Sequence, residues 1–310
     1  MMTELRTAPT ESPVTGATPT APRTEVVTTV SKTSRRFGRK IFASAPIERT
    51  CGIVLLALLT ASFVIVPFFS QDPDALAGMP MQPPSGAHWF GTDWLGRDLF
   101  SRVFYAGRVD LLIVVTGVGV CVVLGTLIGM LVASAGKAVR AVMMRVIDAF
   151  IAVPFIVIVV VLVNVMGHQQ WIPFVPPSVG ALILSIAIVG WAGYARLTIG
   201  QALALREREH VVAARLLGYS RGRVLVRHVA PSVMGVNLSF AASAAVGTVG
   251  LVASLAFLGA GVQEPTPDLG AMMAGGLQLL PVAPWITIIP GMVVLLLGMS
   301  FALIADANRD

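Results

Sequence analysis

The stretch Glu209-His-Val-Val-Ala-Ala-Arg-Leu-Leu-Gly218, which runs on to Val229-Ala-Pro231, is charged and helix-prone, and it lies between two long apolar segments. Glu, Ala, Arg and Leu are good helix formers, and Gly218 stands at a position where a glycine typically ends a helix. Ser220 is a favourable N-cap residue for a second helix. The stretch predicts two short helices joined by a glycine turn. Such a structured loop indicates a docking surface for another molecule, and an ordinary solvated loop is the alternative, because charge is normal on loops.

The rest of the chain is too apolar for a soluble protein. Of its 310 residues 55% are hydrophobic and 12% are charged, and the mean hydropathy is +0.82. A soluble globule of this composition would expose large apolar patches. A transmembrane helix needs about 20 apolar residues to cross a hydrocarbon core of about 30 Å. Continuous runs of Val, Ile, Leu, Ala and Gly predict an all-α membrane protein with six transmembrane helices, at about 51–69, 109–135, 143–165, 179–201, 235–257 and 285–305.

The positions of the basic residues predict the orientation in the membrane. Lys and Arg gather before the first segment, between the second and third, and between the fourth and fifth, whereas 166–178 and 258–284 contain none. By the positive-inside rule the basic loops and both termini are cytoplasmic. The net charge of +6 is therefore a sign of topology, any attraction to anionic membrane lipid is secondary, and no nucleic-acid partner is expected.

The composition divides the chain into two parts. Residues 1–48, rich in Thr, Pro and Ala and ending in a basic collar, predict a disordered cytoplasmic tail. Residues 49–310 predict a transmembrane domain whose largest cytoplasmic loop is about 202–234. No metal site is expected, because His168 has no second His or Cys spaced to join it.

Two segments on the predicted external side have local order. Leu95, Leu99 and Val103 recur at helical spacing after Trp89 and Trp94, which predicts an amphipathic helix lying at the membrane interface. The apolar stretch 269–280 is too short to cross the membrane, so it is either re-entrant or packed on the surface.

Three motifs carry a resemblance to a known family. The loop shows Val212-Ala213-Ala214, three residues, Gly218, nine residues, His228 and then Ala230-Pro231, in the spacing E-A-A-x3-G-x9-I-x-L-P. This resembles the cytoplasmic motif of the membrane permeases of binding-protein-dependent ABC importers. The stretches 89–98 and 255–267 are similar to segments typical of the C-type permease of dipeptide, oligopeptide and nickel importers. Together the matches extend over nearly all of residues 88–310.

The resemblance implies a type I ABC importer permease in the bacterial inner membrane. A homologous second permease would complete the channel, cytoplasmic ATPase subunits would bind ATP and Mg, and an external solute-binding protein would deliver a peptide. The chain itself has no G-x4-G-K-[ST] phosphate loop, so we expect neither enzymatic activity nor a cofactor in it. Val212 replaces the acidic residue of the motif, and Glu209 is the nearest replacement. The residues expected at the ATPase contact are Glu209, Val212, Ala213, Ala214, Gly218, Arg221 and Pro231.

Other functions stay open at this point. Nickel chelates or glutathione could replace peptides as the substrate, because selection would reside largely in the binding protein. An ion-coupled secondary transporter usually needs ionisable groups near the middle of the bilayer, and here Asp110, Asp148, Arg196 and Asp306 fall near segment ends. A membrane scaffold without transport activity would leave the spacing of the loop unexplained.

One face of the fifth segment is a candidate wall of the translocation path. Small and polar residues follow one another there at spacings of four, four, three and four residues, which places them on one side of a helix. They predict either close helix packing of the small-xxx-small kind or a weakly interacting pore wall. The residues are Ser239, Ser243, Gly247, Gly250 and Ser254.

Overall fold

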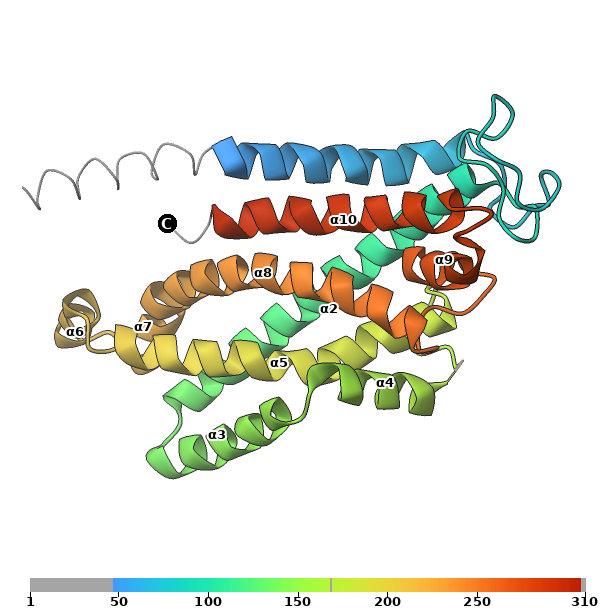
Figure 1. The fold of residues 1–310 in the computed structure, drawn as a ribbon. Helices are drawn as coiled ribbons and strands as arrows, with labels where there is room; N and C mark the ends of the chain where they lie inside the picture. Colours follow the sequence, from blue (N-terminus) through green and yellow to red (C-terminus); the bar gives the residue numbers. More distant parts are fainter. Residues whose placement is uncertain (1–46, 168, 308–310) are drawn as a thin grey trace, which may run out of the picture. The chain divides into compact units, whose positions relative to one another are not determined.

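The computed structural model describes residues 47–167 and 169–307. The predictions for residues 1–46 of the N-terminal tail and for His168 lie outside these residues. Figure 1 shows the helices. They are the first span (Ile47–Phe68) with its terminal turn η1 (Val66–Phe68), α2 (Leu99–Ser134), α3 (Lys137–Ala152), α4 (Phe155–Met166), α5 (Pro177–Leu205), α6 (Glu209–Leu216), α7 (Arg221–Val224), η2 (Leu225–Val229), α8 (Ala230–Phe257), α9 (Leu269–Gly276), η3 (Leu277–Leu279) and α10 (Trp285–Asp306).

The prediction of a helical membrane protein is confirmed. Within the described residues five helices are long and apolar enough to cross a membrane, and the bent pair α3–α4 makes a sixth span if it is counted as one. We call the end of the bundle that carries 202–234 the cytoplasmic end, following the charge distribution, and the opposite end the external end.

The predicted third span is not one helix. α3 ends at Ala152, α4 begins at Phe155, and their axes differ by 84°. The cause is Pro154, which has no N–H group for a helical hydrogen bond and whose ring disfavours helical geometry in the residue before it. The prediction of a continuous segment 143–165 was therefore wrong at this point.

The helix α2 is longer than a membrane is thick. Its 36 residues correspond to about 54 Å at 1.5 Å per residue, against a core of about 30 Å. Residues 99–103 are its first turns, so the prediction of a separate interfacial helix there was wrong. Asp98 caps this helix, because its carboxylate accepts a hydrogen bond from the Ser101 N–H at 2.9 Å.

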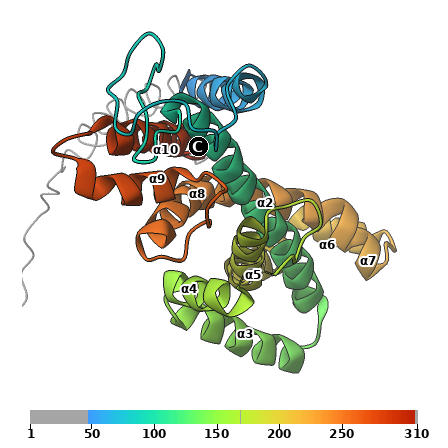
Figure 2. The same cartoon turned by 90° about the vertical axis from the view of Figure 1, so that its right-hand side faces the viewer.

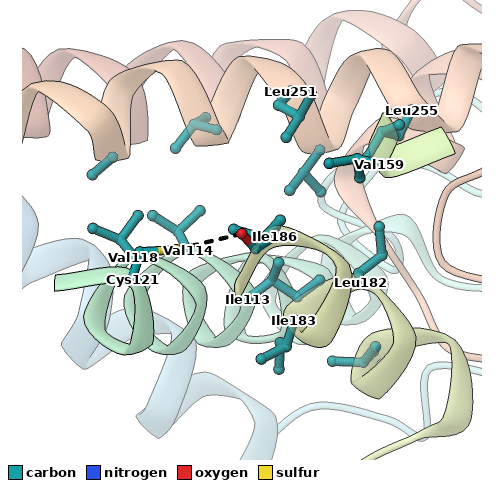
Figure 3. Close-up of a cluster of buried hydrophobic side chains, with 14 of the residues drawn as sticks. Ile113, Val114, Val118, Cys121, Val159, Leu182, Ile183, Ile186, Leu251 and Leu255 are labelled. Atoms are coloured by element: carbon teal, nitrogen blue, oxygen red, sulfur yellow. Dashed lines mark hydrogen bonds between the residues drawn. The ribbon is translucent and has the colours of Figure 1, made fainter. Parts of the chain in front are cut away.

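The core is built where α2, α5 and α8 meet (Figure 3). Glycines on α2 allow α5 to approach closely: a Cβ at Gly129 would lie 2.6 Å from the Cβ of Thr198. Ile113, Leu182 and Leu255 are among the fully buried side chains of the cluster. One polar group also joins the three helices, since the buried Asn237 side chain donates to Thr126 Oγ1 at 2.7 Å and to Thr198 Oγ1 at 2.8 Å.

The remaining helices flank this core. Figure 2 shows α3 and α4 on the side of α5 that faces away from α10. The stretch 269–280 forms α9 and η3. α9 packs between α8 and α10, since a Cβ at Gly270 would lie 2.8 Å from Ala253 and a Cβ at Gly276 would lie 2.8 Å from Ile286. The stretch is thus a short helix packed on two spans, and both alternatives, re-entrant or surface-packed, stay predictions.

Candidate coupling loop and transport path

The cytoplasmic loop folds as the predicted helix, glycine turn and second helix. α6 spans eight residues, and Gly218 follows it with φ +86°, in the left-handed region that glycine adopts without steric cost. The Tyr219 N–H donates to the Ala214 carbonyl at 3.2 Å, which closes the end of the helix. The prediction that Gly218 ends the first helix is confirmed.

The inner side of α6 is packed against the rest of the chain. Ala214 is 4% exposed and Val211 is fully buried, in an apolar cluster with Met130 of α2, Ala202 of α5 and Val233 of α8. The short side chain of Ala214 therefore brings α6 close to its own spans. Any effect of Ala214 on a separate subunit would then be exerted through the packing of α6.

The outer tip of the loop exposes large apolar side chains. Leu216 is 84% exposed and Leu217 78% exposed, and Tyr219 and Val226 of the same loop are also exposed. Adjacent exposed apolar residues on a short, structured loop are typical of a surface that another protein covers. Sequence reasoning missed this pair, although two leucines directly before the terminal glycine were visible.

The other predicted contact residues flank this tip. Glu209 is exposed and begins α6, where a negative charge favours the helix dipole. Val212 and Ala213 lie on α6 and Arg221 begins α7, and their side chains lie outside the described set. Pro231 is exposed in the first turn of α8.

Pro231 also explains an irregular turn at the root of the loop. η2 is a π-helix in which the Ala230 N–H donates to the Leu225 carbonyl. Because Pro231 has no N–H for the carbonyl four residues before it, the wider turn replaces the regular one. The loop thus enters α8 through a local interruption of the helix.

The predicted path residues lie on one unburied side of α8. Ser239 and Ser243 are half-buried, and Gly247, Gly250 and Ser254 are exposed. A Cβ added at Gly247 or Gly250 would meet no atom within 4 Å. At these two glycines the face is therefore not used for close packing inside the described part of the chain, and the prediction of a pore wall stays a prediction.

A cavity of about 600 Å³ opens beside this face, between α2, α5, α8 and the break of α3–α4. Gly247 is the one predicted path residue that lines it. Sequence reasoning did not find the other walls, because they depend on the bend at Pro154. Among them are Cys121, Val153, Gly193, Tyr194, Phe240 and Thr248.

The stretches 89–98 and 255–267 meet at the external end. Arg97 Nε donates to Asp93 Oδ2 at 2.6 Å and Arg97 Nη2 donates to Glu264 Oε1 at 3.1 Å. Arg102 Nη1 donates to Asp74 Oδ1 at 2.9 Å. Arg97 is 5% exposed and Arg102 2% exposed. Burial lowers the pKa of Arg97, but its bonds and charge pairs with Asp93 and Glu264 outweigh burial and raise this pKa overall.

Apolar spans, an interrupted helix beside a cavity, and a loop with an exposed apolar tip define the class: a membrane transport subunit. Residues 125–309 match the family described as binding-protein-dependent transport system inner membrane component, and the chain belongs to this family. It is thus a multi-pass permease of the inner membrane.

Curated relatives cover most of the chain. The oligopeptide transport system permease protein OppC of Haemophilus influenzae is 30% identical over 89% of this chain and 85% of its own length. The dipeptide transport system permease protein DppC of Alkalihalophilus pseudofirmus is 31% identical over 83% and 84%. The probable D,D-dipeptide transport system permease protein DdpC of Escherichia coli is 33% identical over 86% and 87%.

Proposed function

We propose that this chain is the permease subunit of a peptide importer and forms half of its translocation pathway. A homologous second permease supplies the other half, an external solute-binding protein delivers the peptide, and cytoplasmic ATPase subunits bind ATP and Mg and supply the energy. The names of the relatives support the substrate class. The permease itself needs no cofactor in this proposal, since nucleotide chemistry belongs to its partners.

The observation that carries the proposal is the form of the cytoplasmic loop. Its motif spacing, the turn at Gly218 and the exposed pair Leu216 and Leu217 occur together on one short element. We assign the contact with the ATPase to this tip, with Glu209 beside it. An apolar groove on the ATPase subunit would bury both leucines, and each such side chain contributes about 1.5–3 kcal/mol when it leaves water.

Force from the ATPase would enter the membrane domain through the root of the loop. Val211 and Ala214 belong to one apolar cluster with residues of α2, α5 and α8, so a shift of α6 would reach the spans through this cluster. The π-turn before Pro231 gives α8 a point at which its first turns can change direction. Closing of the ATPase pair would then exchange the inward and outward openings by a rigid-body movement.

Transport by the purified complex tests this function. The permease pair, the ATPase subunits and the binding protein are reconstituted in liposomes, and uptake of a labelled peptide is measured with ATP or with a proton gradient. We expect uptake that requires ATP and the loaded binding protein. Uptake that follows the proton gradient without ATP would overturn the proposal.

A further inference from the structure

The break between α3 and α4 leaves backbone groups without partners at the wall of the cavity. In the described part of the chain no N–H group after Ala152 makes a close, well-aligned hydrogen bond back to the last turn of α3. Pro154 has no N–H, and no side chain caps the start of α4. The final carbonyl groups of α3 and the first N–H groups of α4 thus lack helical partners, and Val153, Pro154, Phe155 and Ile156 line the cavity.

Unpaired backbone groups at membrane depth restrict what can occupy the cavity. Each such group costs several kcal/mol in hydrocarbon, so irregular backbone is tolerated where it is covered by protein or lines a polar space. A lipid tail has no donor or acceptor to offer. A spanning helix of another subunit uses its own backbone groups internally. An extended peptide, in contrast, has a free N–H and a free carbonyl at almost every residue.

The other walls combine apolar surface, open space and one unused hydroxyl group. Val118, Ile186 and Leu251 belong both to the cavity and to the apolar cluster of Figure 3. At Gly193 and Gly247 an added Cβ would meet no atom within 4 Å. The Tyr194 hydroxyl is buried, and no hydrogen-bond partner for it occurs among the described residues. Such a group is normally satisfied by water or by a ligand.

The size and charge of the cavity further limit which ligands it can bind. Its volume of about 600 Å³ falls within the roughly 300–1,000 Å³ of small-ligand sites, which are mostly apolar with a few polar groups. No Asp, Glu, Lys or Arg is among its lining residues. A charged side chain would lose hydration there without a counter-charge, whereas an apolar side chain would gain from burial.

We propose that this cavity is a peptide-binding site on the translocation path, in which an apolar side chain of the cargo lies between α5 and α8 while the peptide backbone bonds to the free groups at the α3–α4 break. The inference rests on the proposed peptide transport and adds a preference of the permease itself, separate from that of the binding protein. Gly193 and Gly247 provide the space for the side chain, and Tyr194 provides a further hydrogen bond.

Filling the cavity tests the site. Gly193→Leu and Gly247→Leu are compared with wild type and with Gly298→Leu, a matched change on α10 where an added Cβ also meets no atom within 4 Å. ATP-driven uptake of dileucine and of diglycine is measured in liposomes with a binding protein that delivers both. We expect the cavity variants to lose dileucine uptake by about tenfold or more, as for an excess methylene group in an apolar pocket, and to lose diglycine uptake by a clearly smaller factor.

Equal losses for both peptides, or unchanged uptake of both, would overturn the site. Wild-type protein that takes up neither peptide with ATP would instead overturn the proposed function, so the two failures are distinguishable. A second measurement avoids the risk that a variant fails to assemble: a dipeptide with a photoreactive leucine is activated during turnover in the wild-type complex. Labelling of cavity residues on α5 or α8 is expected, and labelling confined to other parts of the chain contradicts the site.

Discussion

We call the stretches 70–102 and 258–284, which lie at the external end, the external cap. The external cap and the cytoplasmic loop are held to the same spans by different interactions. At the external end Arg97 and Arg102 are buried and bonded to carboxylates of three separate stretches, at Asp74, Asp93 and Glu264. At the cytoplasmic end α6 rests on a small cluster of Ala, Val and Met side chains. Buried charge pairs fix one geometry, because a misplaced partner leaves an uncompensated charge. Short apolar contacts are not directional, and they tolerate a shift.

From this difference we can infer which end keeps its shape and which end receives force. The cap satisfies its charged groups within the chain, whereas the loop leaves Leu216 and Leu217 exposed. In the proposed function the ATPase subunit covers them. We infer that the cap is a fixed platform and that the loop is the element that an ATPase subunit moves.

Removing one charge from the cap should give the largest effect on stability. Arg97→Ala removes the partner of Asp93 at 2.6 Å and leaves Arg102, at 3.7 Å, as its charged partner; breaking a buried pair costs up to about 3–5 kcal/mol. We expect a lower melting temperature and less assembled complex in detergent. Arg108→Ala, at an exposed position of α2, is the control. Equal melting of both variants would show that the cap is not fastened by these charges.

A side chain at the glycine turn should have a smaller effect, confined to the loop. Gly218→Val forces a branched residue into the left-handed region, at a cost of roughly 1–2 kcal/mol or more. We expect the helix end at Tyr219 to loosen and uptake to fall, while the spans still melt as in wild type. Gly222→Val, in a helical position of α7, is the matched change without the positive φ. If both variants transport alike, the turn does not shape the contact.

The cap should also respond to pH, with a still smaller effect. Burial raises the pKa of Asp268, and this outweighs two bonds that lower it, one with the neighbouring Asp110 carboxyl and one from the Ala271 N–H, by which Asp268 caps α9 at 2.7 Å. Because the folded-state pKa is raised, the folded protein holds this proton more tightly than the unfolded chain does. The resulting contribution to the free energy of unfolding is complete below the ordinary aspartate pKa, and it is lost as pH rises through the folded-state pKa. Asp268→Asn keeps a capping oxygen but removes this proton equilibrium.

We therefore expect wild-type protein to lose thermal stability more steeply than the Asp268→Asn variant as pH rises above the ordinary aspartate range, with about 1.4 kcal/mol for each unit of pKa shift. Melting curves of the detergent-solubilised complex measure the slope. Parallel curves for the two proteins would contradict a protonated group at Asp268.

The sequence predicted what local patterns determine. Apolar runs predicted the spans, and the glycine after a short charged helix predicted the turn at Gly218, because both depend on neighbouring residues. The spacing of Ser and Gly on α8 predicted one common face, and Gly247 of that face lines the cavity. In these cases a periodicity is enough to place a side chain.

The features that the sequence did not predict are of two kinds. Some depend on contacts between distant residues, and one, the helix break at Pro154, lies inside an apolar run that looks like a continuous span. The hydrogen bond between Arg97 and Glu264 joins residues 167 positions apart, so no local sequence pattern predicts it. Ala214 has the same small side chain whether it faces its own spans or a partner, and packing alone decides which. Pro154 was visible in the sequence, but the apolar run around it concealed the helix break.

The most direct test of the central claim compares Leu217→Asp with Val282→Asp in the reconstituted complex. Both replace an exposed apolar residue, one at the cytoplasmic tip and one at the external end. ATP-driven peptide uptake is measured in liposomes that contain equal amounts of each permease. We expect Leu217→Asp to reduce uptake by about tenfold or more, as for loss of an interface hot spot, and Val282→Asp to stay close to wild type. Undiminished uptake by Leu217→Asp would contradict the claim that force enters this protein through the tip of its cytoplasmic loop.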